Sequence, residues 1–460
     1  MDNYNLWSLR LGFSGKQEQL IRKEGIKDFL KNSFATVPDT ALPDFMKDEA
    51  RTPAQINAYR NSFKTMEGGN MLRQKLHRRV AYDFKGWWIG KMMNDKYPLR
   101  EKMTVFWHNH YVATDGKIEV NYWMYTHNRI LRENAFGNFR ELTKKMLRSN
   151  SLVKYLDNDQ NIKDRYNENL SRELLELFTI GVGNYTEDDI KNGAKGLAGL
   201  TPGAESAEYL PKNECPDPIT YFNKTGHFKS DAMVDIIFEQ PNAPYFITRK
   251  LLKWFIYDDP SEEMVKYYGD YLKKKDYEIE PLLTKIVTTE FKKPTAGSKI
   301  KDPLVYYIQL HHELNASGQN NKIIAVLLRR QGMDLYGQNN VKGWYGGTYW
   351  ITAQLYLQRN TTADMLCRGN NLNHDQVVEV EEDEVYPKKI GVRIDYTKKG
   401  TNKEVISELK NRLLFTVSED QEKEFEQILQ HDFNPNGKSA DTAVLQLFNY
   451  MVRTPEFQLI

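Results

Sequence analysis

The sequence predicts a mainly α-helical protein, a large multi-helical bundle around a single core. Apolar residues recur at steps of three and four along most of the chain, whereas the alternation typical of strands is scarce. A chain of 460 residues that is 40% hydrophobic and 27% charged can bury a large core. Helical periodicity marks residues 16–32, 54–66, 69–95, 98–112, 118–149, 166–180, 186–198, 231–256, 261–275, 278–291, 303–315, 321–332, 348–358, 403–415, 419–431 and 439–453.

Start and stop signals support several of these helices. Thr186 and Asp189 form a capping-box pair, Gly181 and Gly183 follow the end of the preceding helix, and Ser261 stands where another helix begins. These signals fall at the boundaries that the apolar periodicity indicates.

Two long irregular stretches interrupt the helices: residues 201–229, with four prolines, and the glycine-rich residues 332–349. Long loops in compact domains are usually functional or disordered, and the aromatic residues in both stretches favour order. We therefore expect the rim of any pocket there. Strands are expected near residues 377–396, as a small hairpin-like insertion with an acidic edge; the alternative is an interaction tail.

We expect one large helical domain over residues 1–460. Its parts in chain order would be a helical core (1–200), an irregular loop (201–230), a helical half (231–360), an insertion (361–402) and C-terminal helices (403–460).

Charge and cysteine content exclude several classes of protein. The formal net charge is +2, so no global field attracts nucleic acid. The two cysteines, Cys215 and Cys367, are too few for a disulfide framework or a cysteine-ligated zinc site, and we expect free thiols. No Walker-type loop, dinucleotide fingerprint or Gly-x-Ser-x-Gly elbow is present, so kinase, dehydrogenase and hydrolase-fold activities are not favoured.

The N-terminal residues lack a basic segment followed by an apolar one, so no signal peptide is visible. No window approaches the roughly 20 apolar residues of a transmembrane helix. We expect a cytoplasmic protein as the sequence is given, or an exported one if a leader was removed.

The most informative segment is the acidic helix expected over residues 166–180. Glu168, Arg172 and Glu176, together with Asn169, lie opposite its apolar stripe, and i, i+4 pairing would explain the three charges at a few tenths of a kcal/mol per pair. Glu173 falls on the border of the stripe, where a partly buried acid needs a partner or a cation. Glu173 is therefore a candidate catalytic or metal-binding residue.

A calcium site is a second interpretation of this region. Asp157, Asp159, Asn161 and Glu168 occupy positions 1, 3, 5 and 12 of a calcium-binding loop. Ile162 stands where the loop needs glycine for its sharp turn, which argues against this interpretation.

Several blocks of the chain resemble one known family. They are residues 98–111 (PLREKMTVFWHNHY), 128–138, 155–157, 167–190, 249–251, 340–344 and 455–458. Together they resemble the signatures of a large bacterial family catalogued as domain of unknown function eighteen-hundred. The resemblance implies a mainly helical protein without a settled activity. It also implies a sulfatase-like companion protein, because many members are encoded beside one, and export, from which the missing leader departs.

The histidines of the 98–111 block face different ways. On a regular helix, His108 points about 200° away from His110, so the two cannot ligate one metal unless the helix ends before them. Either one is packed in an aromatic wall and the other is satisfied by a carbonyl or carboxylate, or at least one binds a metal or transfers a proton. A nuclease of the His-Asn-His type is not supported, because that motif needs a strand-turn-helix metal site.

A third interpretation joins the blocks around a divalent metal or a substrate. His108 or His110 would meet Glu173, Glu176 and the loop residue His227 there. No Glu-x-x-His pair occurs in either block, which argues against a di-iron site. The neighbouring pair His311-His312 is expected to be structural.

The leading hypothesis is an enzyme with a His/Glu pocket, metal-dependent or not, that acts on a polar small molecule or a saccharide. A metal-dependent hydrolase or oxidoreductase would fit. The alternative is a non-catalytic, saccharide- or protein-binding helical protein, which the 27 tyrosines favour. The candidate catalytic residues are Glu173, His110, His108, His227 and Arg172, and the candidate binding residues are Trp107, Glu176, Asn169, Trp344 and Tyr345.

Overall fold

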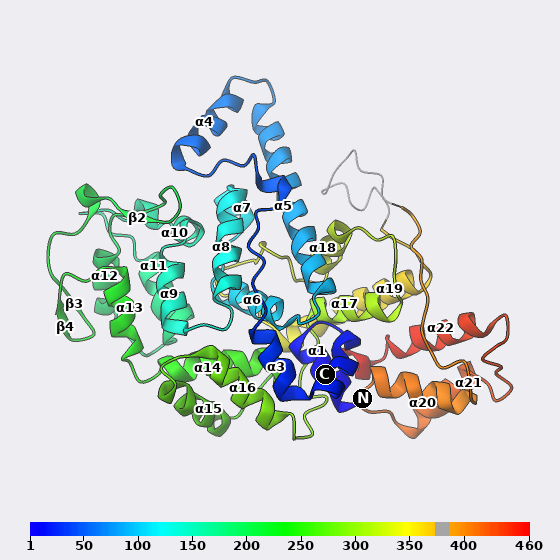
Figure 1. The fold of residues 1–460 in the computed structure, drawn as a ribbon. Helices are drawn as coiled ribbons and strands as arrows, with labels where there is room; N and C mark the ends of the chain where they lie inside the picture. Colours follow the sequence, from blue (N-terminus) through cyan, green and yellow to red (C-terminus); the bar gives the residue numbers. More distant parts are fainter. Residues whose placement is uncertain (373–386) are drawn as a thin grey trace.

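The structure of the protein, a computed structural model, describes residues 1–372 and 387–460. Helices dominate it (Figure 1). The first half of the chain contains α1 (Asn3–Leu11), α2 (Glu18–Glu24), α3 (Ile26–Phe34), α4 (Pro53–Lys64), α5 (Gly69–Asn94), α6 (Leu99–His110), α7 (Asp115–Ile118), α8 (Asn121–Glu133), α9 (Phe139–Leu147), α10 (Asn150–Tyr155), α11 (Asn169–Glu173), the π-helical turn η4 (Leu174–Thr179) and α12 (Glu187–Gly196). The second half contains α13 (Ser230–Phe238), α14 (Ala243–Phe255), α15 (Glu262–Lys274), α16 (Ile279–Glu290), α17 (Pro303–Glu313), α18 (Asn321–Arg330), the short 3-10 helix η6 (Gly347–Ile351), α19 (Ala353–Cys367), α20 (Asn402–Leu413), α21 (Glu419–Ile428) and α22 (Ala440–Met451).

The predicted mainly helical fold is confirmed, with differences at helix boundaries. The helix expected over 16–32 is two helices, because Gly25 adopts a φ of +78° between α2 and α3. The segment 118–149 holds the end of α7 and all of α8 and α9, and the side chain of Asn138 caps the start of α9. Helices α1 and α10 were not predicted. The apolar period is therefore a better guide to helix content than to helix ends.

The strands of the described chain lie where an irregular loop was expected. β1 (Leu200–Thr201) pairs antiparallel with β2 (Glu208–Tyr209), and β3 (Ile219–Tyr221) pairs with β4 (Lys224–Gly226). Phe222 and Asn223 both have positive φ, as a tight two-residue hairpin turn requires. Strands of two or three residues are too short to show alternation in the sequence.

The predicted strand-bearing insertion falls partly outside the described residues. Residues 377–386 of it are not described. Residues 387–396 form isolated bridges, Asn370 with Lys389 and Ser317 with Gly391, but no strand among the described residues.

The two ends of the chain meet within the same core. Buried apolar side chains form a continuous cluster that runs from Leu6 to Ile460. The guanidinium of Arg10 donates to the Ile460 carbonyl at 3.2 Å, and the two termini lie near each other in Figure 1. Helix α1 and the last residues of the chain therefore stabilise one another.

Helix α6 lies at the centre of the molecule. Each of its residues except Asn109 is buried, including charged ones. The Glu101 carboxylate accepts two hydrogen bonds from Arg132 and one from the Trp88 indole, at 2.7 to 2.9 Å. A buried charge without such partners would cost several kcal/mol, so these bonds hold α6 in one position. Its C-terminal histidines are consequently well fixed.

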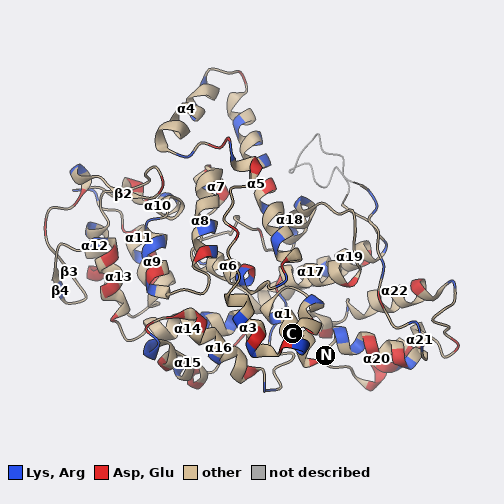
Figure 2. Ribbon diagram, in the orientation of Figure 1, with Lys and Arg blue, Asp and Glu red and all other residues tan. Residues whose placement is uncertain are grey.

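Charges of both signs are spread over the helices (Figure 2), as expected from 64 basic and 62 acidic residues. Within the part of the chain that the structure describes, no helix has the length and apolar character needed to cross a bilayer.

Candidate functional site

Trp107 and His108 of α6 belong to the packed core. The Trp107 indole donates to the Ala135 carbonyl at 3.0 Å. His108 is fully buried with its ring edge-on to Trp88 and Tyr336, and its Nε2 accepts the Tyr336 amide at 3.1 Å. Since Nε2 accepts, the ring proton is assigned to Nδ1. Burial lowers the pKa of His108 well below its usual value, so the ring is neutral.

Asn109 ties the loop of residues 332–347 to the end of α6. Its Oδ1 accepts the Trp344 amide at 2.6 Å, and its Nδ2 donates to the Trp344 carbonyl at 3.4 Å. The backbone comes this close because Gly343 has a φ of +79°, and a Cβ there would lie 2.3 Å from Asn109 Oδ1. Gln338 adds a bond to the His108 carbonyl at 3.3 Å. The loop is therefore an ordered wall.

His110 forms a hydrogen-bonded pair with Lys250 of α14. Lys250 Nζ donates to His110 Nδ1 and to the Leu177 carbonyl, each at 3.0 Å. His110 Nε2 lies 3.0 Å from the Phe178 carbonyl, which can only accept, so the ring proton is assigned to Nε2. Lys250 and His110 therefore each donate a hydrogen bond to a backbone carbonyl of the same turn.

That turn is η4, where the acidic helix widens from α to π geometry. The amides of Ile180 and Gly181 both bond to the Leu175 carbonyl, at 3.1 and 3.0 Å. In a continuing α-helix the Gly181 amide would bond to Leu177 instead. The Leu177 carbonyl is thereby left for Lys250, at a helix end that carries partial negative charge and favours a cation.

Burial lowers the pKa of both members of this pair. It lowers the pKa of Lys250 from 10.5 to about 7. Burial, and then the nearby Lys250 charge, lower the pKa of His110 well below its usual value. At pH 7 His110 is therefore neutral, while Lys250 divides between amine and ammonium. Such a group can both accept and donate a proton under physiological conditions.

The pair lines a cavity of about 510 Å³ between α6, α14, residues 258–302 and residues 342–350. Its aromatic lining residues are Phe106, Trp254, Trp344, Tyr345, Tyr349 and Trp350, its lysines are Lys250, Lys253, Lys299 and Lys342, and its acids are Asp258, Asp259 and Asp302. The rings of Tyr345 and Tyr349 stack with centroids 4.8 Å apart and are 62% and 60% exposed. Exposed stacked aromatics at a cavity rim are suited to the apolar face of a ligand ring.

The charged face of the acidic helix makes other contacts. Arg172 pairs with Glu168, as the i, i+4 spacing predicts, and also with Glu187. Glu176 accepts a hydrogen bond from the Tyr185 hydroxyl at 3.0 Å, and Asn169 is exposed. None of these side chains is among the residues that line the cavity.

Glu173 is partly buried, as its border position predicts. Burial, and then the charge of Glu176, raise its pKa, whereas Lys342 acts in the opposite direction. Lys342 also lines the cavity, but Glu173 does not. The helix thus contributes to the site through the backbone of η4, and Glu173 lies outside the lining.

The residues of the predicted metal sites separate in the structure. Asp157 pairs with Lys117, Asp159 with Lys154 and Glu168 with Arg172, while the Asn161 amide donates to the Ala194 carbonyl. Among the described residues, no three His, Cys, Asp or Glu side chains are grouped so that they could hold a metal ion.

His227 lies apart from the other candidates. It is exposed just after β4 and lines a hollow of about 80 Å³ with Cys215 and Tyr209. Of the predicted site residues, the structure brings His110, Trp344 and Tyr345 together at one cavity.

Lys250 is the main residue that sequence reasoning missed. It lies on α14 with Phe246 four residues before it and Trp254 four residues after it. A lysine flanked at i±4 by aromatic residues on a helix is placed to be desolvated, and that spacing could have identified it.

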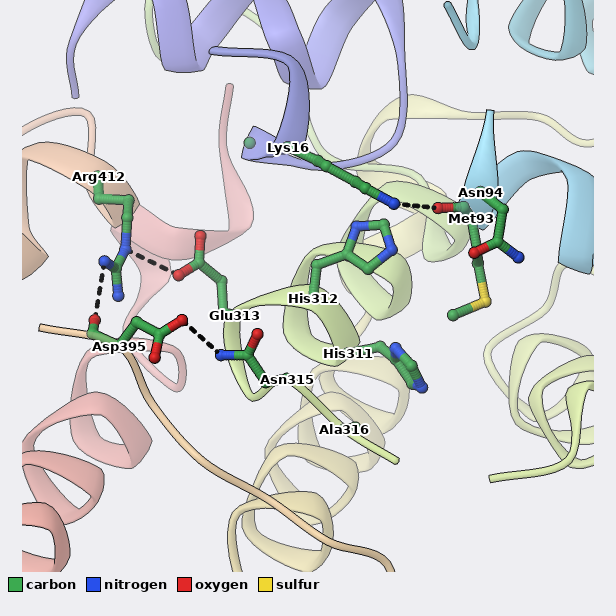
Figure 3. Close-up of a pocket in the computed structure, with 11 residues that line it drawn as sticks. Lys16, Met93, Asn94, His311, His312, Glu313, Asn315, Ala316, Asp395 and Arg412 are labelled. Carbon is green, nitrogen blue, oxygen red and sulfur yellow. Dashed lines mark hydrogen bonds and ion pairs between the residues drawn. The ribbon is translucent and has the colours of Figure 1, made fainter. Parts of the chain in front are cut away.

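A second cavity of about 420 Å³ lies at the C-terminal end of α17 (Figure 3). His312 Nδ1 lies 2.6 Å from the Ser14 hydroxyl, and Lys16 donates to the Met93 carbonyl at 3.3 Å. Burial lowers the pKa of His311 and of His312 to about 4. Both rings are therefore neutral at pH 7.

The acids of the second cavity already have partners. Glu313 pairs with Arg412 at 2.8 Å, and Asp395 accepts from the Asn315 amide at 3.0 Å (Figure 3). The predicted structural role of His311-His312 agrees with these surroundings.

Comparison with known proteins identifies a family. A family model described as "Protein of unknown function (DUF1800)" matches residues 6–459. No curated protein and no solved structure matches the chain.

Proposed function

The chain belongs to the DUF1800 family of proteins of unknown function, and we propose that it is an enzyme acting on a polar small molecule or a saccharide. The substrate would bind in the cavity between α6, α14 and residues 342–350, where His110 and Lys250 would transfer a proton. The observation that carries the proposal is the 3.0 Å hydrogen bond between Lys250 Nζ and His110 Nδ1 at the cavity wall.

The surroundings of the pair support chemistry on a polar ligand with an apolar face. The stacked rings of Tyr345 and Tyr349 offer an aromatic platform, and lysines and aspartates around the wall offer hydrogen bonds to hydroxyl or carboxylate groups. Glu173 does not line the cavity. Lys250 is therefore the proposed general base, in place of the carboxylate that the sequence predicts.

A second candidate function is saccharide binding without catalysis. The exposed, stacked rings of Tyr345 and Tyr349 favour it, because aromatic platforms bind sugars whether or not a reaction follows. The cytoplasmic location, a bound divalent metal and a sulfatase-like companion remain predictions from the sequence.

Binding can be measured by calorimetry with a panel of neutral, acidic and amino saccharides. We expect Tyr349→Ala to weaken binding of any panel member by about tenfold, the scale of one lost ring contact. Tyr59→Ala removes a tyrosine of α4 that is 40% exposed and does not line the cavity, and should leave affinity unchanged. Equal affinities of the two variants would contradict the placement of the binding site.

Mass spectrometry can detect products formed from a bound saccharide. Their presence or absence shows whether the protein is an enzyme or a binding protein. We expect Lys250→Met to keep the affinity within a few fold and to lower the rate by about 10²- to 10⁴-fold, the usual contribution of an acid-base group. Turnover by Lys250→Met at the wild-type rate would contradict the catalytic role. Binding without any product would favour the second candidate function.

A further inference from the structure

We propose that Lys250 is a nucleophile that forms an imine with an aldehyde or ketone group of the ligand. This proposal rests on the proposed function, because it uses the same cavity, and it names the substrate class as carbonyl compounds, which include open-chain sugars.

The geometry around Nζ favours an unprotonated amine. Its two acceptors, His110 Nδ1 and the Leu177 carbonyl, are both uncharged and each lies 3.0 Å away. A neutral amine has two hydrogens, and each is donated to one of these acceptors. The remaining tetrahedral direction carries the lone pair, which is the reactive feature of an imine-forming lysine.

Two other lysines near the cavity, Lys299 and Lys102, differ in this respect. Lys299 pairs with Asp258 at 3.6 Å, and Lys102 pairs with Asp302 at 3.3 Å. Carboxylate partners stabilise the ammonium form. Among the described residues Lys250 takes part in no ion pair, although its Nζ lies 4.9 Å from the centre of the Phe246 ring. Its lowered pKa, about 7, is consistent with an available amine at neutral pH.

The reaction balances without a redox partner. The Nζ lone pair attacks the carbonyl carbon, a C–N bond forms, and the C=O π pair moves to oxygen. One proton passes from Nζ through His110 Nδ1 to that oxygen and gives a carbinolamine. The C–O bond then breaks, the nitrogen lone pair forms C=N, and the hydroxyl group leaves as water with the second proton of Nζ, again passed through His110 Nδ1. The sum is amine plus carbonyl gives imine plus one water.

Two neighbours assist these steps. His110 keeps its own proton on Nε2, bonded to the Phe178 carbonyl, so Nδ1 is free to relay a proton. An imine that takes up one proton from solvent is a cation, and the Leu177 carbonyl at the end of η4, 3.0 Å from Nζ, would accept its N–H.

The test is reductive trapping of the wild-type protein with glycolaldehyde and sodium cyanoborohydride at pH 7, followed by peptide mapping. Lys253, an exposed lysine of the same cavity wall, is the internal control. At pH 7 about half of an amine with a pKa of about 7 is unprotonated, against roughly one part in 2,500 for an ordinary lysine. Nucleophilicity falls with pKa, so we expect labelling of Lys250 to be about tenfold or more faster.

Variants confirm the site. Lys250→Met should abolish the fast labelling, and Lys274→Met, which removes an exposed lysine of α15 outside the cavity lining, should keep it. Equal labelling of Lys250 and Lys253 in the wild type would overturn the proposal, and this comparison does not depend on how a variant folds.

The labelling result also distinguishes a failure of the imine proposal from a failure of the proposed function. If Lys250 is not labelled but Lys250→Met loses turnover of a bound saccharide, the imine is wrong and proton transfer stands. If Lys250 is labelled rapidly but the protein turns over no saccharide, the nucleophile stands and the proposed saccharide reaction fails.

Discussion

The two cavities described above both contain a lysine and a histidine but connect them differently. In the cavity beside α6, Lys250 donates directly to His110 at 3.0 Å. In the cavity at the end of α17, Lys16 donates to a backbone carbonyl and His312 contacts a serine hydroxyl. Only the first of these two arrangements joins the lysine and the histidine of one cavity by a hydrogen bond. A direct bond between the two side chains, rather than their presence in one cavity, distinguishes the candidate active site.

The two cavities also differ in the partners of their charged groups. In the second cavity, Glu313 forms an ion pair with Arg412 at 2.8 Å. Lys250 in the first has uncharged partners, so its protonation is decided by burial. The residues of the pair are 140 positions apart in the chain, whereas the adjacent His311 and His312 have rings 6.1 Å apart and no bond to each other. Closeness in sequence is a poor guide to a functional pair here.

The largest expected effect is on the pH dependence of stability in Lys250→Met. The folded pKa, about 7, lies below the unfolded value near 10.4, so the unfolded chain binds more protons between these values. The free energy of unfolding of the wild type should rise with pH across this window by about 1.4 kcal/mol per unit. Lys250→Met lacks this term, so its stability relative to the wild type should be highest at pH 7 and fall toward pH 10.

Urea unfolding at pH 7, 8, 9 and 10 measures this difference. Lys253→Met, which removes the exposed lysine of the same wall, is the control. If the difference in free energy of unfolding between wild type and Lys250→Met does not change with pH, the pKa of Lys250 is not lowered. The electrostatic contrast between the two cavities would then be wrong.

Gly343→Ala should disrupt the wall of the first cavity. The new Cβ would lie 2.3 Å from Asn109 Oδ1 and 2.5 Å from the Asn109 carbonyl, at a φ of +79°. We expect a loss of about 2–4 kcal/mol from the clash and the left-handed backbone together. Gly318→Ala has a φ of +81° with open space around it, and should cost only the backbone term of about 1–2 kcal/mol. Equal losses in chemical denaturation would mean that the loop adapts.

Glu313→Gln probes the second cavity, with a smaller effect of opposite sign. Burial raises the pKa of Glu313, although Arg412 acts against it. A raised carboxyl pKa gives stability below the unfolded value near 4.3 that is lost as pH rises through the folded pKa. The wild type should therefore lose stability relative to Glu313→Gln as pH rises above about 4. Glu408→Gln, which removes another acid that pairs with Arg412, is the control for thermal melts across this range.

The sequence predicted the helical architecture and part of the site. The apolar period identified most helices, and the aromatic, glycine-rich stretch around Trp344 was correctly expected to be ordered at a pocket. The helical spacing also placed His108 and His110 on opposite sides, which the structure confirms through their separate partners.

The pairing of Lys250 with His110 and the geometry of η4 could not be derived from the same signals. The pairing of His110 with Lys250 depends on how α6 packs against α14, which one sequence does not specify. The π turn follows from an extra residue in a helix whose apolar stripe fits α geometry equally well. Helical spacing predicts the partial burial of Glu173 but not the direction in which its side chain faces.

The η4 turn has a consequence for how the site tolerates change. The Leu177 and Phe178 carbonyls that hold Lys250 and His110 are backbone atoms, so substitution of either side chain leaves them in place. Removal of one residue within Leu174–Thr179 would restore α geometry and rotate the following carbonyls by about 100°. The site is thus robust to point substitution in this turn and vulnerable to a single-residue deletion, because it depends on the number of residues rather than their identity.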